Sequence, residues 1–227
     1  MTVAAVILAA SPASALADAD GTPGARRATD TAWSGGATPV VVCSFDPDGA
    51  VAASLANAEV TLVDPVAPEL GPVAQIVNGM EAAARLVVET DAALVWPVRL
   101  AWVDAETVTT LIATHGEDRE IVLRPTFEDE PGWPTLVPLS HLPSLRALSA
   151  TRMPDELLDD LEAAGVPFAL VESGDPGVTH DVSVALAHLP PYAGPPEPAD
   201  AHAHEWGAGA ADLPDELPVP GPSRLRG

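Results

Sequence analysis

The chain has 227 residues, and its 33 acidic residues outnumber 10 cationic ones, which gives a formal charge of −23. All ten cations are arginine, so any mechanism that needs a lysine is excluded, including a Schiff base or a phosphate-binding ammonium. The acidity disfavours nucleic acid and membranes as partners, because both attract basic surfaces. The single cysteine, Cys43, permits no internal disulfide and predicts a cytoplasmic location.

A short apolar run, Val3 to Ala10, opens the chain. Its continuous apolar character predicts a strand that is covered on both faces. Small residues at 14–18 leave a second interpretation open, in which the first ~17 residues are a cleaved signal peptide of a secreted acidic protein. The run lacks the preceding basic residues of such a signal, so we favour the buried strand. No stretch reaches the ~20 apolar residues that a membrane span needs.

Strand-like and helix-like stretches alternate along the rest of the chain. In order, the predicted elements are a strand at 38–44, a helix at 51–57, a strand at 59–64, a helix at 72–90, a strand at 91–98, a helix from Asp104 to about His115, strands at 120–124 and 134–139, a helix at 154–164 and a strand at 166–172. Prolines predict that the strand at 134–139 lies at a sheet edge. The alternation predicts a three-layer α/β fold, Rossmann-like, with a mostly parallel sheet.

Five other features point to local structure rather than to chemistry. Residues 46–49 (Asp-Pro-Asp-Gly) predict a turn, because the other ligands of a calcium loop do not follow. Trp96, Trp102 and Trp133 are predicted to lie in the core, as is Cys43.

The composition changes near residue 190. Beyond it the chain is rich in proline, alanine, glycine and acid without periodicity, which predicts a folded domain over 1–190 and a disordered acidic tail over 191–227. His202, His204 and Glu205 carry metal-ligating groups, but a flexible segment offers no preformed geometry, so we favour a solvated tail. The tryptophan at 206 gives the tail a candidate docking group for a protein partner.

Four segments, taken in order, resemble the MobA-like NTP transferases, which are guanylyl- and cytidylyltransferases of the molybdenum cofactor. They are residues 6–10, residues 71–74 (Gly-Pro-Val-Ala), residues 94–98 with 103–112, and residues 132–136 with 174–181. The resemblance implies the fold of nucleotide-diphospho-sugar transferases. It also implies transfer of a nucleoside monophosphate from an NTP to a phosphorylated acceptor such as molybdopterin.

The same resemblance implies a set of site residues. The nucleotide is expected against the loop after the first strand, at the start of the helix near residue 72, and after the strand at 91–98; these positions are Ala9, Ala10, Ser11, Gly71, Pro72 and Arg99. A Mg²⁺ ligand is expected near Asp181 or Ser183, and Asp181 carries the carboxylate that could coordinate it.

Several residues that this chemistry needs are replaced. Ser11 and Pro12 stand where the family has a flexible glycine loop, and Pro12 removes one N–H donor. Asp18 and Asp20 are expected to add negative charge near the phosphates. Arg99 stands where the family has a metal-binding aspartate, and arginine, which has only donors, cannot bind Mg²⁺.

These replacements predict a divergent or catalytically impaired transferase that retains at most the binding of a nucleotide or phospho-ligand. The alternative is a non-catalytic scaffold that uses the fold and its tryptophan-bearing tail to bind a protein. Arg99 itself has two interpretations: it binds a phosphate in place of the metal, or it forms a structural ion pair with Asp181 or Asp64. Structural ion pairs are common at such positions, so we favour the second.

Overall fold

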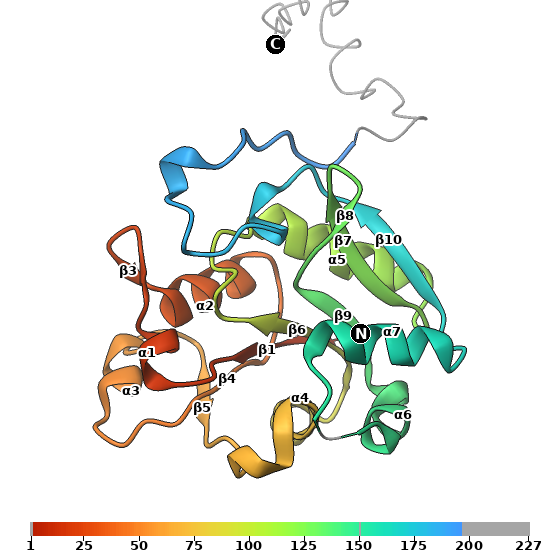
Figure 1. The fold of residues 1–227 in the computed structure, drawn as a ribbon, viewed down its shortest axis with the longest axis horizontal. Helices are drawn as coiled ribbons and strands as arrows, with labels where there is room; N and C mark the ends of the chain where they lie inside the picture. Colours follow the sequence, from red (N-terminus) through yellow and green to blue (C-terminus); the bar gives the residue numbers. More distant parts are fainter. Residues whose placement is uncertain (1, 150, 197–227) are drawn as a thin grey trace, which may run out of the picture. The chain divides into compact units, whose positions relative to one another are not determined.

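A mixed sheet forms the centre of the computed structural model, which describes residues 2–149 and 151–196. Its strand order is β10-β7-β9-β6-β1-β4-β5 (Figure 1). The strands are β1 (Thr2–Leu8), β4 (Val40–Cys43), β5 (Thr61–Val63), β6 (Thr90–Pro97), β7 (Val122–Phe127), β9 (Thr135–Pro138) and β10 (Phe168–Glu172). Every neighbouring pair on this path is parallel except the two that β9 makes. The predicted α/β class and mostly parallel sheet are therefore confirmed.

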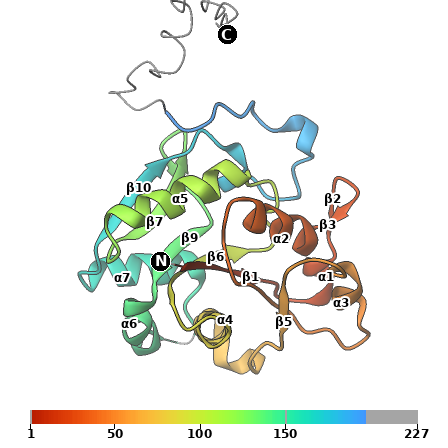
Figure 2. The ribbon, with the colours of Figure 1, turned by 180° about the vertical axis from the view of Figure 1, so that it is seen from behind.

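Helices cover both faces of this sheet and make the three predicted layers (Figures 1 and 2). One face carries α2 (Gly24–Ser34) and α5 (Ala105–Glu117), which pack on each other and on the strands. The other face carries α4 (Gly71–Leu86), against which α6 (Leu142–Ala147) and α7 (Pro154–Ala163) pack. Shorter elements complete the described chain: α1 (Pro12–Ala15), β2 (Asp18–Ala19), β3 (Thr22–Pro23), α3 (Ala50–Ser54), β8 (Glu130–Pro131), and the 3₁₀ turns η1 (Pro68–Leu70), η2 (Leu139–His141), η3 (Pro176–Val178) and η4 (Leu186–His188).

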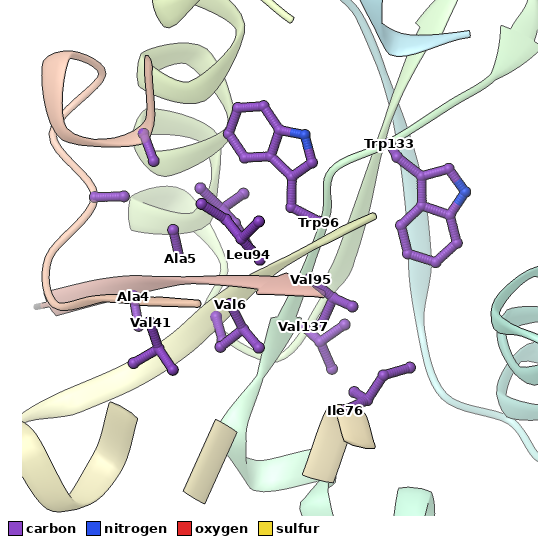
Figure 3. Packing of buried hydrophobic residues seen from close by; sticks show 14 of the residues in the cluster. Ala4, Ala5, Val6, Val41, Ile76, Leu94, Val95, Trp96, Trp133 and Val137 are labelled. Atoms are coloured by element: carbon purple, nitrogen blue, oxygen red, sulfur yellow. The ribbon is translucent and has the colours of Figure 1, made fainter. Parts of the chain in front are cut away.

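Strand β1 lies in the middle of the core, between β4 and β6. Its side chains alternate between the two helical layers: Ala5 lies on the same side as Trp96, and Val6 lies on the side of Ile76 (Figure 3). Both faces are covered, which explains why the strand reads as one continuous apolar run. Residues 2–8 thus form the buried strand that the favoured interpretation predicts.

Several local predictions are also confirmed. The Asp104 carboxylate caps α5 by accepting the Glu106 N–H at 2.9 Å. The Asp46 carboxylate accepts the N–H groups of Val51 and Ala52, both at 2.9 Å, so this segment is a turn that leads into α3. The three tryptophans named above are all buried. Cys43 is buried too, and burial raises the pKa of its thiol to about 12, which makes it an unreactive core residue.

Most predicted elements shift by one to three residues at an end, and two differ more: β9 in its position in the sheet and α4 in where it ends. Strand β9 is not at an edge, because it pairs with β6 on one side and β7 on the other. Its prolines do not interrupt the pairing, since Pro134 precedes the strand and Pro138 ends it. Helix α4 ends at Leu86 instead of residue 90, because Val87 is already extended and Thr90 begins β6.

Helix α2 has no counterpart among the predicted elements. Its buried face is made largely of alanines, Ala25, Ala28 and Ala32, and such small side chains give a weak periodic signal. Its first residue follows Pro23, which makes no side-chain cap that a pattern could reveal.

The folded body extends past residue 190, where the domain was predicted to end. The Tyr192 hydroxyl donates to a Glu106 carboxylate oxygen at 2.7 Å, and the Ala193 N–H donates to the Gly174 carbonyl at 3.1 Å. Residues 191–196 thus pack on the domain, and the remainder of the predicted tail, with its histidines and Trp206, lies outside the described residues. Within the described ranges, none of the helices combines the length and apolarity that a membrane crossing requires.

His115 makes stability depend on pH. Its ring is fully buried on α5, neither ring nitrogen has a hydrogen-bond partner, and the nearest carboxylate oxygen, on Asp91, is 3.7 Å away. Burial lowers the pKa of His115, against the opposing attraction of Asp91. Below about pH 6.5 the unfolded chain therefore binds a proton that the folded chain resists. The free energy of unfolding decreases as the pH is lowered through this range, by at most about 1.4 kcal/mol per pH unit.

Urea unfolding between pH 5 and pH 8 measures this effect. His115→Leu is expected to flatten the slope below pH 6.5, and His188→Gln, which changes an exposed ring, is the matched control. An unchanged slope in His115→Leu would show that the buried imidazole is not responsible.

Candidate functional site

The carboxyl ends of the parallel strands meet at one edge of the sheet. The Val98 N–H donates to the Leu8 carbonyl at 3.0 Å, which joins the end of β6 to the end of β1. The Ala9 N–H donates to the Cys43 carbonyl at 3.0 Å, which joins β1 to β4. Parallel α/β sheets bind ligands outside these ends, so this edge is the candidate site.

The loop after β1 is a short helical turn whose polar groups bond to each other. Ser11 caps α1: its hydroxyl accepts the Ser14 N–H at 3.1 Å, and the Ser14 hydroxyl accepts the Ser11 N–H at 3.0 Å. Pro12 follows the cap at the first helical position. This reciprocal capping box satisfies the polar groups of the turn within the protein. A rigid turn therefore stands where the resemblance implies a flexible glycine loop.

This bonding leaves few donors for phosphates. The N–H groups of Ala9, Ser11, Ser14 and Ala15 all have partners within the protein, and Pro12 has none to offer. Ala10 is exposed at the start of the turn. A loop that cradles phosphates needs several free N–H groups in one concavity, and this loop does not provide them.

Arg99 and Asp181 lie on neighbouring segments at the same edge. Arg99 follows β6, and its carbonyl accepts the Val182 N–H at 2.9 Å. The Trp102 indole donates to the carbonyls of Asp181 and Val184 at 3.1 and 3.0 Å. Both residues therefore lie at the carboxyl edge of the sheet, and the Trp102 side chain holds their two segments together.

The predicted ion pairs of Arg99 are not formed. In the part of the chain that the structure describes, its guanidinium has no carboxylate within 4.0 Å, neither that of Asp181 nor that of Asp64. The Asp181 carboxylate instead accepts the Ser183 hydroxyl at 2.5 Å and the Ser183 N–H at 2.9 Å. The Ser183 hydroxyl, with a smaller contribution from the charge of Arg99, lowers the pKa of Asp181.

A buried carboxylate fixes the segment that precedes Asp181. Asp175 accepts the Asp104 N–H, the Thr107 hydroxyl and the Gly177 N–H, each at 2.8 Å. Burial raises the pKa of Asp175, and the three donors offset part of that cost. Asp175 thereby joins the start of α5 to the turn η3, which leads into residues 179–184.

The remaining residues named from the sequence lie on other elements, α4 and the β2–β3 hairpin. Gly71 and Pro72 begin α4, whose first turn follows β5 and so lies toward the carboxyl edge, on the face of the sheet opposite α2. Asp18 and Asp20 lie in the β2–β3 hairpin, where Asp18 accepts the Gly21 N–H at 3.0 Å. The Asp18 carboxylate is thus engaged by its own turn.

Two cavities lie outside this set of residues. One of about 280 Å³ runs along α4 and is lined by Val73, Val77 and Arg146 among others. One of about 350 Å³ lies between α2 and the start of α5, where Arg27 stacks on the Trp102 ring at 4.9 Å. Neither of these two cavities is lined by a predicted site residue.

The residues at this edge do not fit a divalent metal. Mg²⁺ takes oxygen ligands, with one or two carboxylates in most protein sites. Asp181 offers one carboxylate, already engaged by Ser183, and Arg99 places a cation where a second would stand. Over residues 2–149 and 151–196 no group of three His, Cys, Asp or Glu side chains is placed to hold a metal.

Sequence reasoning named Ser11 and the segment that contains Asp175, but it missed the hydrogen bonds that build this edge. The paired serines of α1 and the carboxylate of Asp175 act through local hydrogen bonds. The Asp-Pro-Gly order at 175–177 is typical of a turn in which the aspartate binds its own backbone, and this signal could have identified Asp175. The anchoring of residues 181–184 by Trp102 has no local signal, since the residues are far apart in sequence.

Comparison with known proteins gives the same picture of the fold. The family model described as MobA-like NTP transferase domain matches residues 5–166. No curated protein matches the chain.

Solved structures share the fold at low sequence identity. Rv0371c of Mycobacterium tuberculosis H37Rv, determined as a complex with manganese, is 15% identical with a TM-score of 0.58, covering 76% of this chain and 88% of that one. A nucleotidyl transferase from Methanothermobacter, Mth528, is 18% identical with a TM-score of 0.60, covering 77% and 88%. The 4-diphosphocytidyl-2C-methyl-D-erythritol synthase of Anaerococcus prevotii is 11% identical with a TM-score of 0.60, covering 80% and 90%.

Proposed function

Since the chain belongs to the MobA-like NTP transferase family, we propose that it is a divergent member that binds a nucleotide or a phosphorylated small molecule at the carboxyl edge of its sheet, and that it is impaired in nucleotidyl transfer. The single observation that carries this proposal is the replacement of the transfer machinery at an otherwise intact edge: a self-bonded turn after β1, no lysine, and Arg99 after β6.

Binding is supported by the position of the proposed residues. Ala10, Ser11 and Arg99 follow adjacent strands, and Asp181 lies beside them on the segment that Trp102 anchors. In the proposal, Gly71 and Pro72 at the start of α4 contribute from the other face. Loss of transfer is supported by the charge balance, because nucleotidyl transfer depends on positioning and on neutralising the phosphates.

The finer expectations of the family stay predictions. A molybdopterin-like acceptor rests on the resemblance alone, and a cytoplasmic location rests on the cysteine count. The resemblance implies Mg²⁺ at Asp181, but that carboxylate accepts the Ser183 hydroxyl and feels the charge of Arg99, so the proposal includes no metal.

A thermal-shift series with CTP, GTP, CMP and GMP, with and without Mg²⁺, tests the binding. A ligand at one hundred times its Kd stabilises the folded state by about 2.7 kcal/mol, which corresponds to a rise in Tm of roughly 5–10 °C for a domain of this size. Cytidine and guanosine are the matched controls, since they lack the phosphates.

Transfer is tested separately by pyrophosphate release from CTP or GTP with Mg²⁺ and a phosphorylated acceptor. We expect a thermal shift without release. Metal-dependent turnover would overturn the proposed impairment, and the absence of a shift with every nucleotide would overturn the proposed binding.

A further inference from the structure

The edge of the sheet carries a fixed cation where the fold family would hold a divalent one. We infer that the Arg99 guanidinium takes the place of the metal, so that this chain binds phosphomonoesters, such as nucleoside monophosphates, without a divalent cation. The inference rests on the proposed function, because it concerns how the same edge holds its phosphorylated ligand.

Arg99 combines a fixed backbone with an unengaged head group. Its carbonyl accepts the Val182 N–H at 2.9 Å, and two residues earlier Pro97 ends β6 within the sheet. Its side chain is exposed, and within residues 2–149 and 151–196 it makes no ion pair. A guanidinium presented in this way can bind a phosphate through two parallel N–H groups.

The start of helix α2 adds to the positive potential beside Arg99. A Cβ added at Gly24, its first residue, would lie at ordinary contact distance from the residues on either side of Arg99, 3.6 Å from the Val98 carbonyl oxygen and 3.9 Å from Ala101 Cβ. The N-terminal end of a helix carries partial positive charge and favours anions. Arg99 and α2 therefore act in the same direction on a phosphate at this edge.

The same groups act against a metal. A divalent cation near Arg99 would meet a like charge, and the one carboxylate on the adjoining segment, Asp181, already accepts two hydrogen bonds from Ser183. Both of those bonds go to Oδ1, so Asp181 offers a metal its Oδ2 alone, and the charge of Arg99 opposes a cation there.

The loop after β1 limits how many phosphates the edge can hold. The hydrogen bonds of the turn use the N–H groups of Ser11 and Ser14, Pro12 has no N–H, and the chain contains no lysine to neutralise further charge. One guanidinium and one helix end match the charge of a single phosphate, not that of a triphosphate. The ligand class is therefore a phosphomonoester.

Isothermal titration of the full chain with CMP and GMP, and with CTP and GTP, in EDTA and in MgCl₂, tests this inference. We expect the wild-type Kd for a monophosphate to be the same in the two buffers within twofold. We expect Arg99→Gln to weaken that binding tenfold or more, equivalent to about 1.4 kcal/mol, without a change in Tm. Arg85→Gln, which removes an exposed arginine from the last turn of α4, is the matched control and should bind as wild type.

The outcomes distinguish the proposed binding function from the inference that Arg99 replaces the metal. Wild-type binding that requires Mg²⁺ would overturn metal independence and leave the proposed binding function intact, and this comparison needs no variant. Binding that is unchanged in Arg99→Gln would overturn the role of Arg99. Absence of binding by every nucleotide in both buffers would overturn the proposed function and this inference with it.

Discussion

Replacing Trp96 by alanine is expected to lower the free energy of unfolding by about 3–5 kcal/mol, the range for a large aromatic side chain removed from a core. Trp96 has 0% exposure on the central strand β6, where it lies with Leu94 on one side of the sheet (Figure 3). Its indole N–H also donates to the Leu100 carbonyl at 2.8 Å. The variant therefore loses packing and releases the turn that carries Arg99.

Urea unfolding followed by circular dichroism measures this loss. Trp33→Ala is the matched control, since that side chain is 49% exposed on α2 and its removal is expected to cost no more than about 0.5 kcal/mol. Trp96→Phe keeps most of the volume and removes the hydrogen bond, so its cost should lie between the two. A loss below about 1 kcal/mol in Trp96→Ala would contradict the packing described for this residue.

Replacing Asp175 by alanine is expected to cost about 3 kcal/mol, because a buried donor left without an acceptor costs about 1–3 kcal/mol. Three donors lose their acceptor at once: the N–H groups of Asp104 and Gly177 and the hydroxyl of Thr107. Burial raises the pKa of Asp175, so removing a carboxylate that is costly to bury offsets part of the loss.

Equilibrium unfolding at pH 7 measures the effect of this change. Asp118→Ala is the matched control, because Asp118 accepts one N–H at an exposed position and its loss is expected to cost less than about 1 kcal/mol. If Asp175→Ala were as stable as Asp118→Ala, the hydrogen bonds of Asp175 would contribute no measurable free energy of unfolding.

The layers of the fold could be predicted because they depend on local apolar patterns. Strand β1 is covered on both faces and reads as one apolar run, and Asp104 marks the start of α5 by its capping chemistry. Helix α2 could not be predicted, since alanines make its buried stripe. The central position of β9 was also missed, because pairing partners are set by the whole sheet and the flanking prolines suggested an edge.

The candidate site was predictable in its location and less so in its bonding. The order of strands places Ser11 and Arg99 at one edge, and the structure confirms that arrangement. Whether Arg99 pairs with Asp181 depends on a competitor two residues away, the Ser183 hydroxyl, which engages that carboxylate instead. Such a competition between near neighbours is decided by side-chain geometry that a sequence pattern does not contain.

The antiparallel strand β9 sets the order in which a growing chain can complete its sheet. In the described chain β6 and β7 have no direct pairing and are joined through β9. Until residues 135–138 leave the ribosome, β5-β4-β1-β6 ends in the open edge of β6, and β7 has no partner on that side. A nascent chain that pauses before residue 135 therefore exposes the edge of β6 and a strand β7 that lacks both β9 and β10, and such unpaired edges favour edge-to-edge aggregation.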